Sequence, residues 1–199
     1  MNYRDGIVAY IRTQANPPDK FSHQVRLFEL AKRLASEQPF DEEVLFAAAW
    51  MHDLGVFIGH RPEDPAALAK WDNVAYALER TPAILMDLRF PIEKIPAVLE
   101  AIRTHLPSAT PISFEAELLR DADILEQIGT IGILRTASKV GRDTRFIRFT
   151  DAIRVLERNA RELPPLLKLP LARIEAAARV RILETFLEAA KKEALGYEL

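Results

Sequence analysis

The sequence predicts an all-α fold, and three observations carry this prediction. Glycine is scarce, with 7 glycines in 199 residues, so few tight turns and hairpins are expected. Apolar residues recur at helical spacing along most of the chain, and no stretch alternates with the period of two that marks a strand. Helix start and stop signals separate these stretches. At this length we expect a single domain, 1–199, with additional helices at its C-terminal end.

The first half of the chain is expected to hold four main helices. Asp19 is a candidate N-cap, and the acidic run that starts at Asp41 favours the positive end of a helix. Gly55 is a candidate helix stop, and Asp64 followed by Pro65 has the pattern of a cap and a first-turn proline. The expected helices cover 2–13, 19–37, 41–54 and 65–79, with a short helical turn over 83–89.

The second half is expected to hold five helices. Pro96 suits a first helical turn, and Ser113 is a candidate N-cap. Prolines at 164 and 165 end the fourth of these helices, and the last is rich in strong helix formers. The expected ranges are 92–105, 113–127, 131–140, 143–162 and 171–195.

Composition and charge exclude several classes of protein. The formal net charge is −2, which argues against a nucleic-acid binder that depends on bulk positive charge. No segment is apolar for long enough to be a signal peptide or a transmembrane helix, so no membrane partner and a cytoplasmic location are expected. The chain has no cysteine. Any metal site must therefore use His, Asp or Glu.

Three of the four histidines are predicted to lie on buried helix faces. His23, His52 and His105 each continue the apolar stripe of a different predicted helix, whereas His60 lies in a predicted surface loop. A single buried histidine is more often a hydrogen-bonded core residue than a ligand. Three buried imidazoles need three polar partners, and convergence on one metal ion would satisfy all of them.

Three aspartates are candidate ligands beside these histidines. Asp53 directly follows His52, near an expected helix end where neighbouring side chains can converge. Asp121 and Asp123 are two residues apart, so on a regular helix they point about 160° apart and are not expected to bind the same ion. Helical periodicity alone favours Asp121, which lies nearer the apolar stripe.

Four segments, in this order, resemble the HD-domain metal-dependent phosphohydrolases, in particular a bacterial subgroup that includes nucleotide pyrophosphohydrolases. The resemblance covers about residues 20–140 and implies an α-helical HD core there, with a helical extension over about 144–199. The segments are FSHQVRLFELAKRLA, LFAAAWMHDLG, IRTHLP and EAELLRDADILEQIGTIGILR.

The resemblance implies one divalent metal ion held by four side chains. The word Ala-Asp-x-Leu selects Asp123 rather than Asp121, and Asp121 then becomes a catalytic or substrate-side group. Imidazole and carboxylate ligands suit Mn, Fe, Ni, Co or Zn better than Mg. Many two-metal members have a further histidine that is missing from the corresponding stretch 71–77, so a second ion is not expected. The implied ligands are His23, His52, Asp53 and Asp123.

Positive and proton-carrying side chains near these ligands are candidates for substrate binding. Arg26 lies one turn after His23 and could reach a phosphate or form a structural ion pair. Arg135 is a second candidate, whereas solvated surface charge is the expectation for Lys139. His105 could contact phosphate or shuttle a proton. The general base stays open, with Asp53, His105 and Asp121 as the candidate catalytic groups.

The sequence therefore predicts a phosphohydrolase that acts on a nucleotide or another small phosphorylated metabolite through a metal-activated water. One alternative is an HD-fold di-iron oxygenase. Another is a non-catalytic module with a structural metal, in which residues 144–199 form a partner surface or a homodimer interface.

Overall fold

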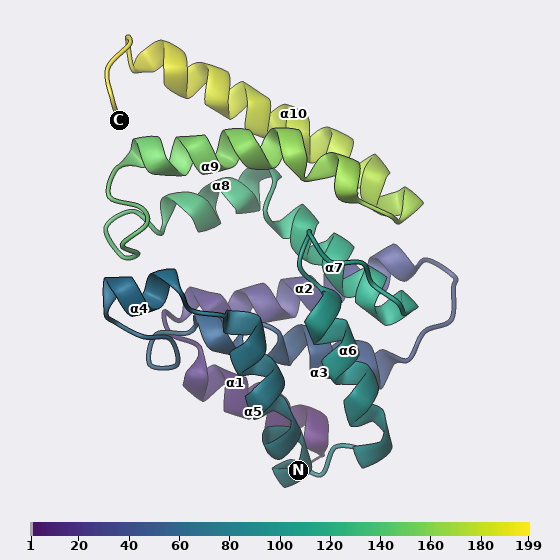
Figure 1. The fold of residues 1–199 in the computed structure, drawn as a ribbon. Coiled ribbons are helices and arrows are strands. Elements are labelled where there is room, and N and C mark those ends of the chain that lie inside the picture. The colour runs from purple at the N-terminus through teal and green to yellow at the C-terminus, as the bar shows by residue number, and fades with distance from the viewer. Residues whose placement is uncertain (1) are drawn as a thin grey trace. The chain divides into compact units, whose positions relative to one another are not determined.

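The computed structural model describes residues 2–199, which form ten α-helices and no strand (Figure 1). The all-α prediction is confirmed. The chain divides into two compact units, one ending at Arg120 and the other covering Asp121–Leu199. This division falls earlier than the expected start of a C-terminal extension at about residue 144, and the single-domain prediction stays a prediction.

The first unit is built around one fully buried helix. Every residue of α3 from Val44 to Met51 is buried, as expected for a helix that is apolar on all sides. Helices α1, α2 and α6 pack against it. The elements are α1 (Tyr3–Gln14), α2 (Asp19–Ala35), α3 (Glu42–Met51), η1 (Leu54–Val56), α4 (Pro65–Ala69), α5 (Asn73–Asp87), η2 (Ile92–Lys94), α6 (Ile95–Thr104) and the start of α7 (Phe114–Glu126).

Several predicted helix starts are confirmed. The Asp41 carboxylate accepts hydrogen bonds from the backbone N–H groups of Glu43 and Val44. Asp64 caps α4, and Ser113 accepts from the N–H group of Ala116 at the start of α7. These caps satisfy N–H groups that have no partner within the helix. Asp19, by contrast, is the first residue of α2 and not its cap.

The expected single helix over 65–79 is wrong, because two separate helices cover this range. Helix α4 ends at Ala69, and Asp72 caps a new helix by accepting from the N–H groups of Val74 and Ala75. That helix, α5, runs through Pro82 to Asp87 and absorbs the short turn expected over 83–89. The intervening Trp71 donates its indole N–H to the carbonyl of Gly55, at 2.7 Å.

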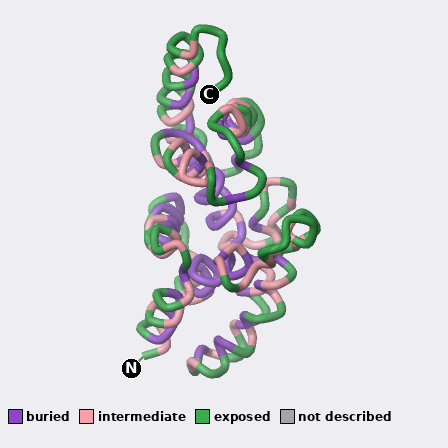
Figure 2. Tube along the Cα trace, turned by 90° about the vertical axis from the view of Figure 1, so that its left-hand side faces the viewer, coloured by how far each residue is buried: buried purple, intermediate pink, exposed green. Residues whose placement is uncertain are grey.

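The second unit contains the rest of α7 and three longer helices. Helix α9 begins at Phe149 and not near 143, because Asp143 pairs with Arg145 in the preceding loop, at 2.8 Å. Helix α10 packs against α8 and α9 and buries Leu183 and Leu187, while its other side is exposed (Figure 2). The elements are α8 (Gly129–Ala137), α9 (Phe149–Glu162), η3 (Pro164–Leu166) and α10 (Pro170–Glu193).

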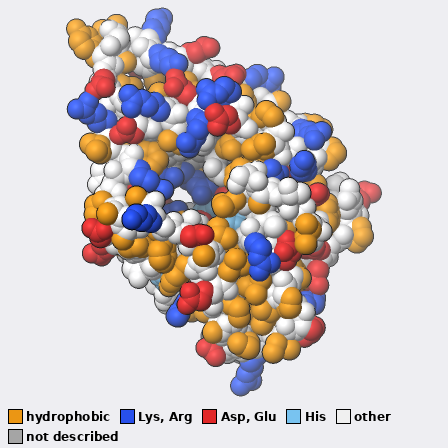
Figure 3. Space-filling view, in the orientation of Figure 1, with side chains coloured by type: hydrophobic (Ala, Val, Ile, Leu, Met, Phe, Trp, Pro, Cys, Tyr) orange, Lys and Arg blue, Asp and Glu red, His pale blue; other side chains and the backbone are white. Residues whose placement is uncertain are grey.

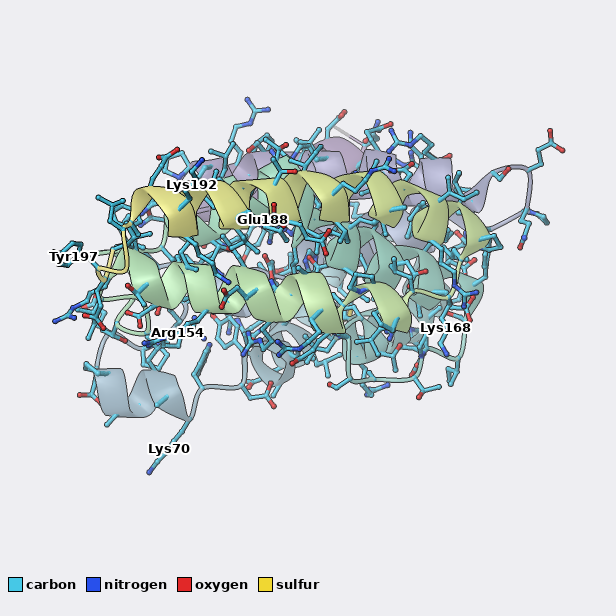
Figure 4. The ribbon with its side chains drawn as sticks, turned by 90° about the horizontal axis from the view of Figure 1, so that it is seen from above. Lys70, Arg154, Lys168, Glu188, Lys192 and Tyr197 are labelled. Carbon is cyan, nitrogen blue, oxygen red and sulfur yellow. The ribbon has the colours of Figure 1, made fainter. Side chains whose placement is uncertain are left out.

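A small cavity lies between α9 and the segment after α10. It measures about 330 Å³, and its lining includes Arg154 on α9 and Tyr197 near the C-terminus (Figure 4). Two cations of the lining form ion pairs within the unit: Arg154 with Asp151 at 3.6 Å, and Lys191 with Glu157 at 2.5 Å.

The surface carries both signs of charge. On the face drawn in Figure 3, Lys and Arg side chains are interspersed with Asp and Glu side chains, in keeping with the net charge of −2. Within the described part of the chain, no helix combines the length and the hydrophobicity that crossing a bilayer requires.

Candidate metal centre

The first unit brings His23, His52 and Asp53 together in a buried cluster. Each offers one ligand atom, and these atoms lie within 4.8 Å of one another. His23 Nε2 is 3.7 Å from Asp53 Oδ2, and His52 Nε2 is 3.6 Å from Asp53 Oδ1. None of the three residues is more than 9% exposed. Three of the four predicted ligands thus converge on one point.

The end of α3 explains how two consecutive residues face one point. The helix stops at Met51, His52 is its C-cap, and Asp53 has φ −97° and ψ 11° at the start of η1. The expected stop at Gly55 is therefore wrong by several residues. Leaving the helix at His52 releases Asp53 from the 100° offset that a regular helix would impose.

Gly55 has a different function, because it allows two backbone segments to meet. A Cβ atom built on Gly55 would lie 2.4 Å from the carbonyl oxygen of Asn73, at the start of α5. Only glycine permits such an approach. Together with the hydrogen bond from Trp71 to the Gly55 carbonyl, this contact fixes the turn that follows the ligand pair.

The protonation pattern of His52 suits a metal ligand. Its Nδ1 lies 2.9 Å from the carbonyl oxygen of Ala49. Because a carbonyl can only accept, we assign the proton to Nδ1, which leaves a lone pair on Nε2. That Nε2 atom is buried and has no hydrogen-bond partner among the described residues. A metal ion would satisfy it, and a backbone carbonyl on the other ring nitrogen is typical of histidine ligands.

His105 lies against this cluster. Its ring centroid is 5.0 Å from that of His52, and the His52 ring is in turn 5.5 Å from that of His23. His105 is 2% exposed, and its Nδ1 lies 2.6 Å from the carbonyl oxygen of Ile102. The three predicted buried histidines therefore lie together within the first unit, with the His52 ring next to the other two.

The second unit holds Asp123 and Arg135 side by side. The Arg135 guanidinium is 3.8 Å from Asp123 Oδ1 and 3.7 Å from Glu126 Oε2. Asp123 is 8% exposed and also accepts a hydrogen bond from the amide of Gln127, at 3.0 Å. The proposed fourth ligand thus has a cation next to it. Its role as a ligand stays a prediction.

Asp121 is completely buried, and its carboxylate accepts hydrogen bonds from backbone N–H groups. Its Oδ2 atom accepts from the N–H groups of Lys168 and Leu169, at 2.8 and 2.7 Å. These groups lie just before α10, so the carboxylate anchors the start of that helix within the second unit. The argument from helical periodicity therefore places Asp121 correctly toward the interior. Its catalytic role stays a prediction.

Two candidates differ from the expected surface positions. His60 is half-buried, with Nε2 2.8 Å from Gln14 Oε1 and Nδ1 3.1 Å from the Tyr76 hydroxyl. Burial, and then the charge of Arg80, lower the pKa of His60. Lys139 is also half-buried, with its ammonium 5.3 Å from the ring centre of Phe146. Neither is simply a solvated surface group.

Two further cations lie on α2. Arg26 donates to the hydroxyl of Ser22, one turn earlier on the same helix, at 3.1 Å. Lys20, which the sequence analysis did not select, lies 3.9 Å from Asp53 Oδ2. Its place one turn before His23 on a predicted helix was the available signal.

Comparison with known families agrees with this geometry. The family model of the HD domain matches residues 21–128. The chain belongs to the HD-domain family. The matched range includes all four proposed ligands, and the predicted resemblance is confirmed. No curated protein gives a significant match to the chain.

Solved structures with the same fold come from several bacteria. A Lactobacillus plantarum protein is 22% identical, with a TM-score of 0.72 and 96% of each chain covered. An HD-superfamily hydrolase from Bacillus thuringiensis is 23% identical, with a TM-score of 0.68 and coverage of 98% of this chain and 97% of its own. Bacillus subtilis YpgQ, solved in complex with ADP, is 19% identical, with a TM-score of 0.70 and coverage of 98% and 96%. These likenesses show a fold shared over nearly the whole chain.

Proposed function

We propose that this chain is a metal-dependent phosphohydrolase that cleaves a phosphate ester or anhydride of a nucleotide or another small phosphorylated metabolite. The observation that carries the proposal is the buried cluster of His23, His52 and Asp53, in which His52 Nε2 has no hydrogen-bond partner among the described residues. Two imidazoles and a carboxylate withdrawn from water are costly to bury unless something binds them.

His23, His52 and Asp53, with Asp123 as the proposed fourth ligand, would hold one divalent ion. This nitrogen and oxygen donor set suits Mn, Fe, Co, Ni or Zn better than Mg. When bound, such an ion supplies a water of lowered pKa and polarises a phosphoryl oxygen.

The surrounding side chains have separate roles in this proposal. Arg135, beside Asp123, and Arg26 would bind phosphoryl oxygens and stabilise the charge that develops on them. His105, whose Nδ1 lies 2.6 Å from the Ile102 carbonyl oxygen, would contact a phosphate oxygen or carry a proton. Asp53 and Asp121 remain the other candidate catalytic groups.

A nucleotide is the favoured substrate. YpgQ, which shares the fold over nearly the whole chain, has been solved in complex with ADP. This supports a nucleotide as the substrate of the present chain. A small-molecule substrate, a cytoplasmic location and a homodimer complete the proposal.

A substrate screen tests this function. Purified protein would be assayed against nucleoside mono-, di- and triphosphates and simple phosphate esters, with Mn²⁺, Fe²⁺, Co²⁺, Ni²⁺, Zn²⁺ or Mg²⁺ added in turn. We expect release of phosphate or pyrophosphate that a chelator abolishes and that the Asp53→Ala variant lacks. Absence of turnover with every ion would overturn the proposal. Two irons per chain with substrate-dependent oxygen uptake would establish the oxygenase alternative instead.

A further inference from the structure

We propose that Lys20 binds substrate phosphate beside the metal centre. The inference rests on the function proposed above and deepens it, because it assigns a substrate-binding group to the edge of that centre. It also implies that Lys20 tunes how tightly the centre binds its ion.

The geometry places Lys20 next to a ligand oxygen. Its Nζ atom is 3.9 Å from Asp53 Oδ2, and the same oxygen is 3.7 Å from His23 Nε2. Lys20 lies in the first turn of α2, one turn before His23, so one helix delivers both groups to the carboxylate. The Lys20 side chain is 24% exposed, whereas that of Asp53 is 12% exposed. A partly exposed lysine side chain therefore lies beside a mostly buried carboxylate.

The Lys20 to Asp53 distance is informative. At 3.9 Å the pair is longer than a hydrogen bond, so Lys20 interacts with Asp53 through charge and does not donate to it at this distance. The ammonium has three N–H donors on a flexible stem, so it is suited to binding phosphoryl oxygens beside the metal centre.

The same charge should oppose metal binding. A cation close to a ligand oxygen repels a second cation at that oxygen, and partial burial limits screening by solvent. Lys20 should therefore weaken metal affinity while it strengthens phosphate affinity. A lysine that only held Asp53 in position would strengthen metal affinity instead. The direction in which Lys20 changes metal affinity therefore distinguishes a phosphate-binding role from a purely structural one.

The experiment compares Lys20→Met and Lys20→Arg with a control on the same helix. Lys32→Met removes an ammonium that pairs with Glu29 at 3.0 Å and lies over the ring of Phe28. Isothermal titration calorimetry would measure binding of Mn²⁺ to metal-free protein, and then binding of tripolyphosphate to Mn²⁺-loaded protein. Thermal melts followed by circular dichroism would verify that each variant is folded.

We expect Lys20→Met to bind Mn²⁺ about threefold more tightly and tripolyphosphate about tenfold more weakly than the unmodified protein. Lys20→Arg should keep both affinities within about twofold, and Lys32→Met should match the unmodified protein. Unchanged tripolyphosphate affinity, or weaker Mn²⁺ binding, in a folded Lys20→Met protein would overturn the inference.

The two proposals can fail separately. If the unmodified protein hydrolyses phosphate compounds while Lys20→Met binds both probes normally, only the assignment of Lys20 is wrong. If both affinities shift as expected but no phosphate compound is hydrolysed, the binding role of Lys20 stands and the proposed function falls. A protein that binds no Mn²⁺ overturns both.

Discussion

His52 and His105 occupy equivalent positions at the ends of two different helices. Each is a C-cap residue, His52 of α3 and His105 of α6. In each, ring Nδ1 lies within hydrogen-bond distance of the carbonyl three residues earlier, 2.9 Å for Ala49 and 2.6 Å for Ile102. The two ring centroids are 5.0 Å apart, with an angle of 74° between the rings. The same local bond therefore sets the same tautomer in both residues.

We predict that the two rings have different roles, metal binding for His52 and acid or base catalysis for His105. His105→Ala should lower kcat about 100-fold, because a positioned acid or base contributes this much. It should leave the metal content unchanged, since His105 is not in the cluster of His23, His52 and Asp53. Turnover and metal analysis of the same preparation would verify both. A loss of metal from His105→Ala would contradict the separate roles of His52 and His105.

Gly55→Ala should strongly destabilise the protein. The added Cβ atom would meet the Asn73 backbone at 2.4 Å, and neither backbone segment can rotate away as a flexible side chain could. We expect a loss of about 2–4 kcal/mol in the free energy of unfolding, measured in urea. Gly6→Ala is the control, because its Cβ would meet only side-chain atoms of Leu88, the nearest being a terminal methyl at 3.0 Å, and alanine favours a helix. Equal stability of the two variants would contradict this explanation.

Asp121→Ala should destabilise the second unit by about 2–4 kcal/mol. It leaves the N–H groups of Lys168 and Leu169 without the carboxylate that accepts from them, and hydrogen bonds to a buried charged group are among the more valuable ones. Asp121→Asn keeps an acceptor oxygen and should cost less. Hydrogen exchange at the start of α10 would report the loss locally. Unchanged exchange there in Asp121→Ala would refute the anchoring role.

The ion pairs of Lys94 should make stability depend on acid pH. Lys94 Nζ lies 2.7 Å from both Asp41 Oδ2 and Glu43 Oε2. Hydrogen bonds from Lys94 and then Tyr3 lower the pKa of Glu43, and Lys94 together with backbone N–H groups lowers the pKa of Asp41 against the opposing effect of burial. A carboxylate whose pKa is lowered in the folded state contributes stability above its unfolded pKa of about 4, and loses it as the pH falls through the folded pKa.

Lys94→Met tests this dependence. Urea unfolding at pH 7, 4 and 3 should show a smaller loss of stability between pH 7 and 3 in the variant than in the unmodified protein. Lys70→Met, a change at an exposed lysine that follows α4, is the control and should keep the original pH profile. An unchanged profile in Lys94→Met would mean that these ion pairs do not contribute.

Features that depend on local chemistry could be predicted from the sequence. The caps at Asp41, Asp64 and Ser113 follow from side chains that bond to backbone N–H groups within three residues. His23 and His52 could be assigned to a buried site, because each continues an apolar stripe. The break between α4 and α5 was missed, because Asp72 is a cap in the middle of a segment that has good helical periodicity on both sides.

Features that depend on tertiary packing could not be predicted. The contact between Lys20 and Asp53 joins residues 33 positions apart and exists only once α2 and α3 have packed. Helical periodicity predicted that Asp121 faces the interior. Its partners, however, come from the turn before α10, far along the chain. Periodicity reports which side of a helix is buried. It does not report which groups meet it there.

Metal stoichiometry tests the central claim most directly, namely that His23, His52 and Asp53 form a metal centre. The unmodified protein, His52→Ala and His60→Ala would each be stripped, reloaded with Mn²⁺ and analysed by inductively coupled plasma mass spectrometry. His60 is the matched control, because it is a histidine of the same unit outside the cluster. We predict about one ion per chain for the unmodified protein and for His60→Ala, and none for His52→Ala. Full metal content in a folded His52→Ala protein, or no metal in the unmodified protein, would contradict the account.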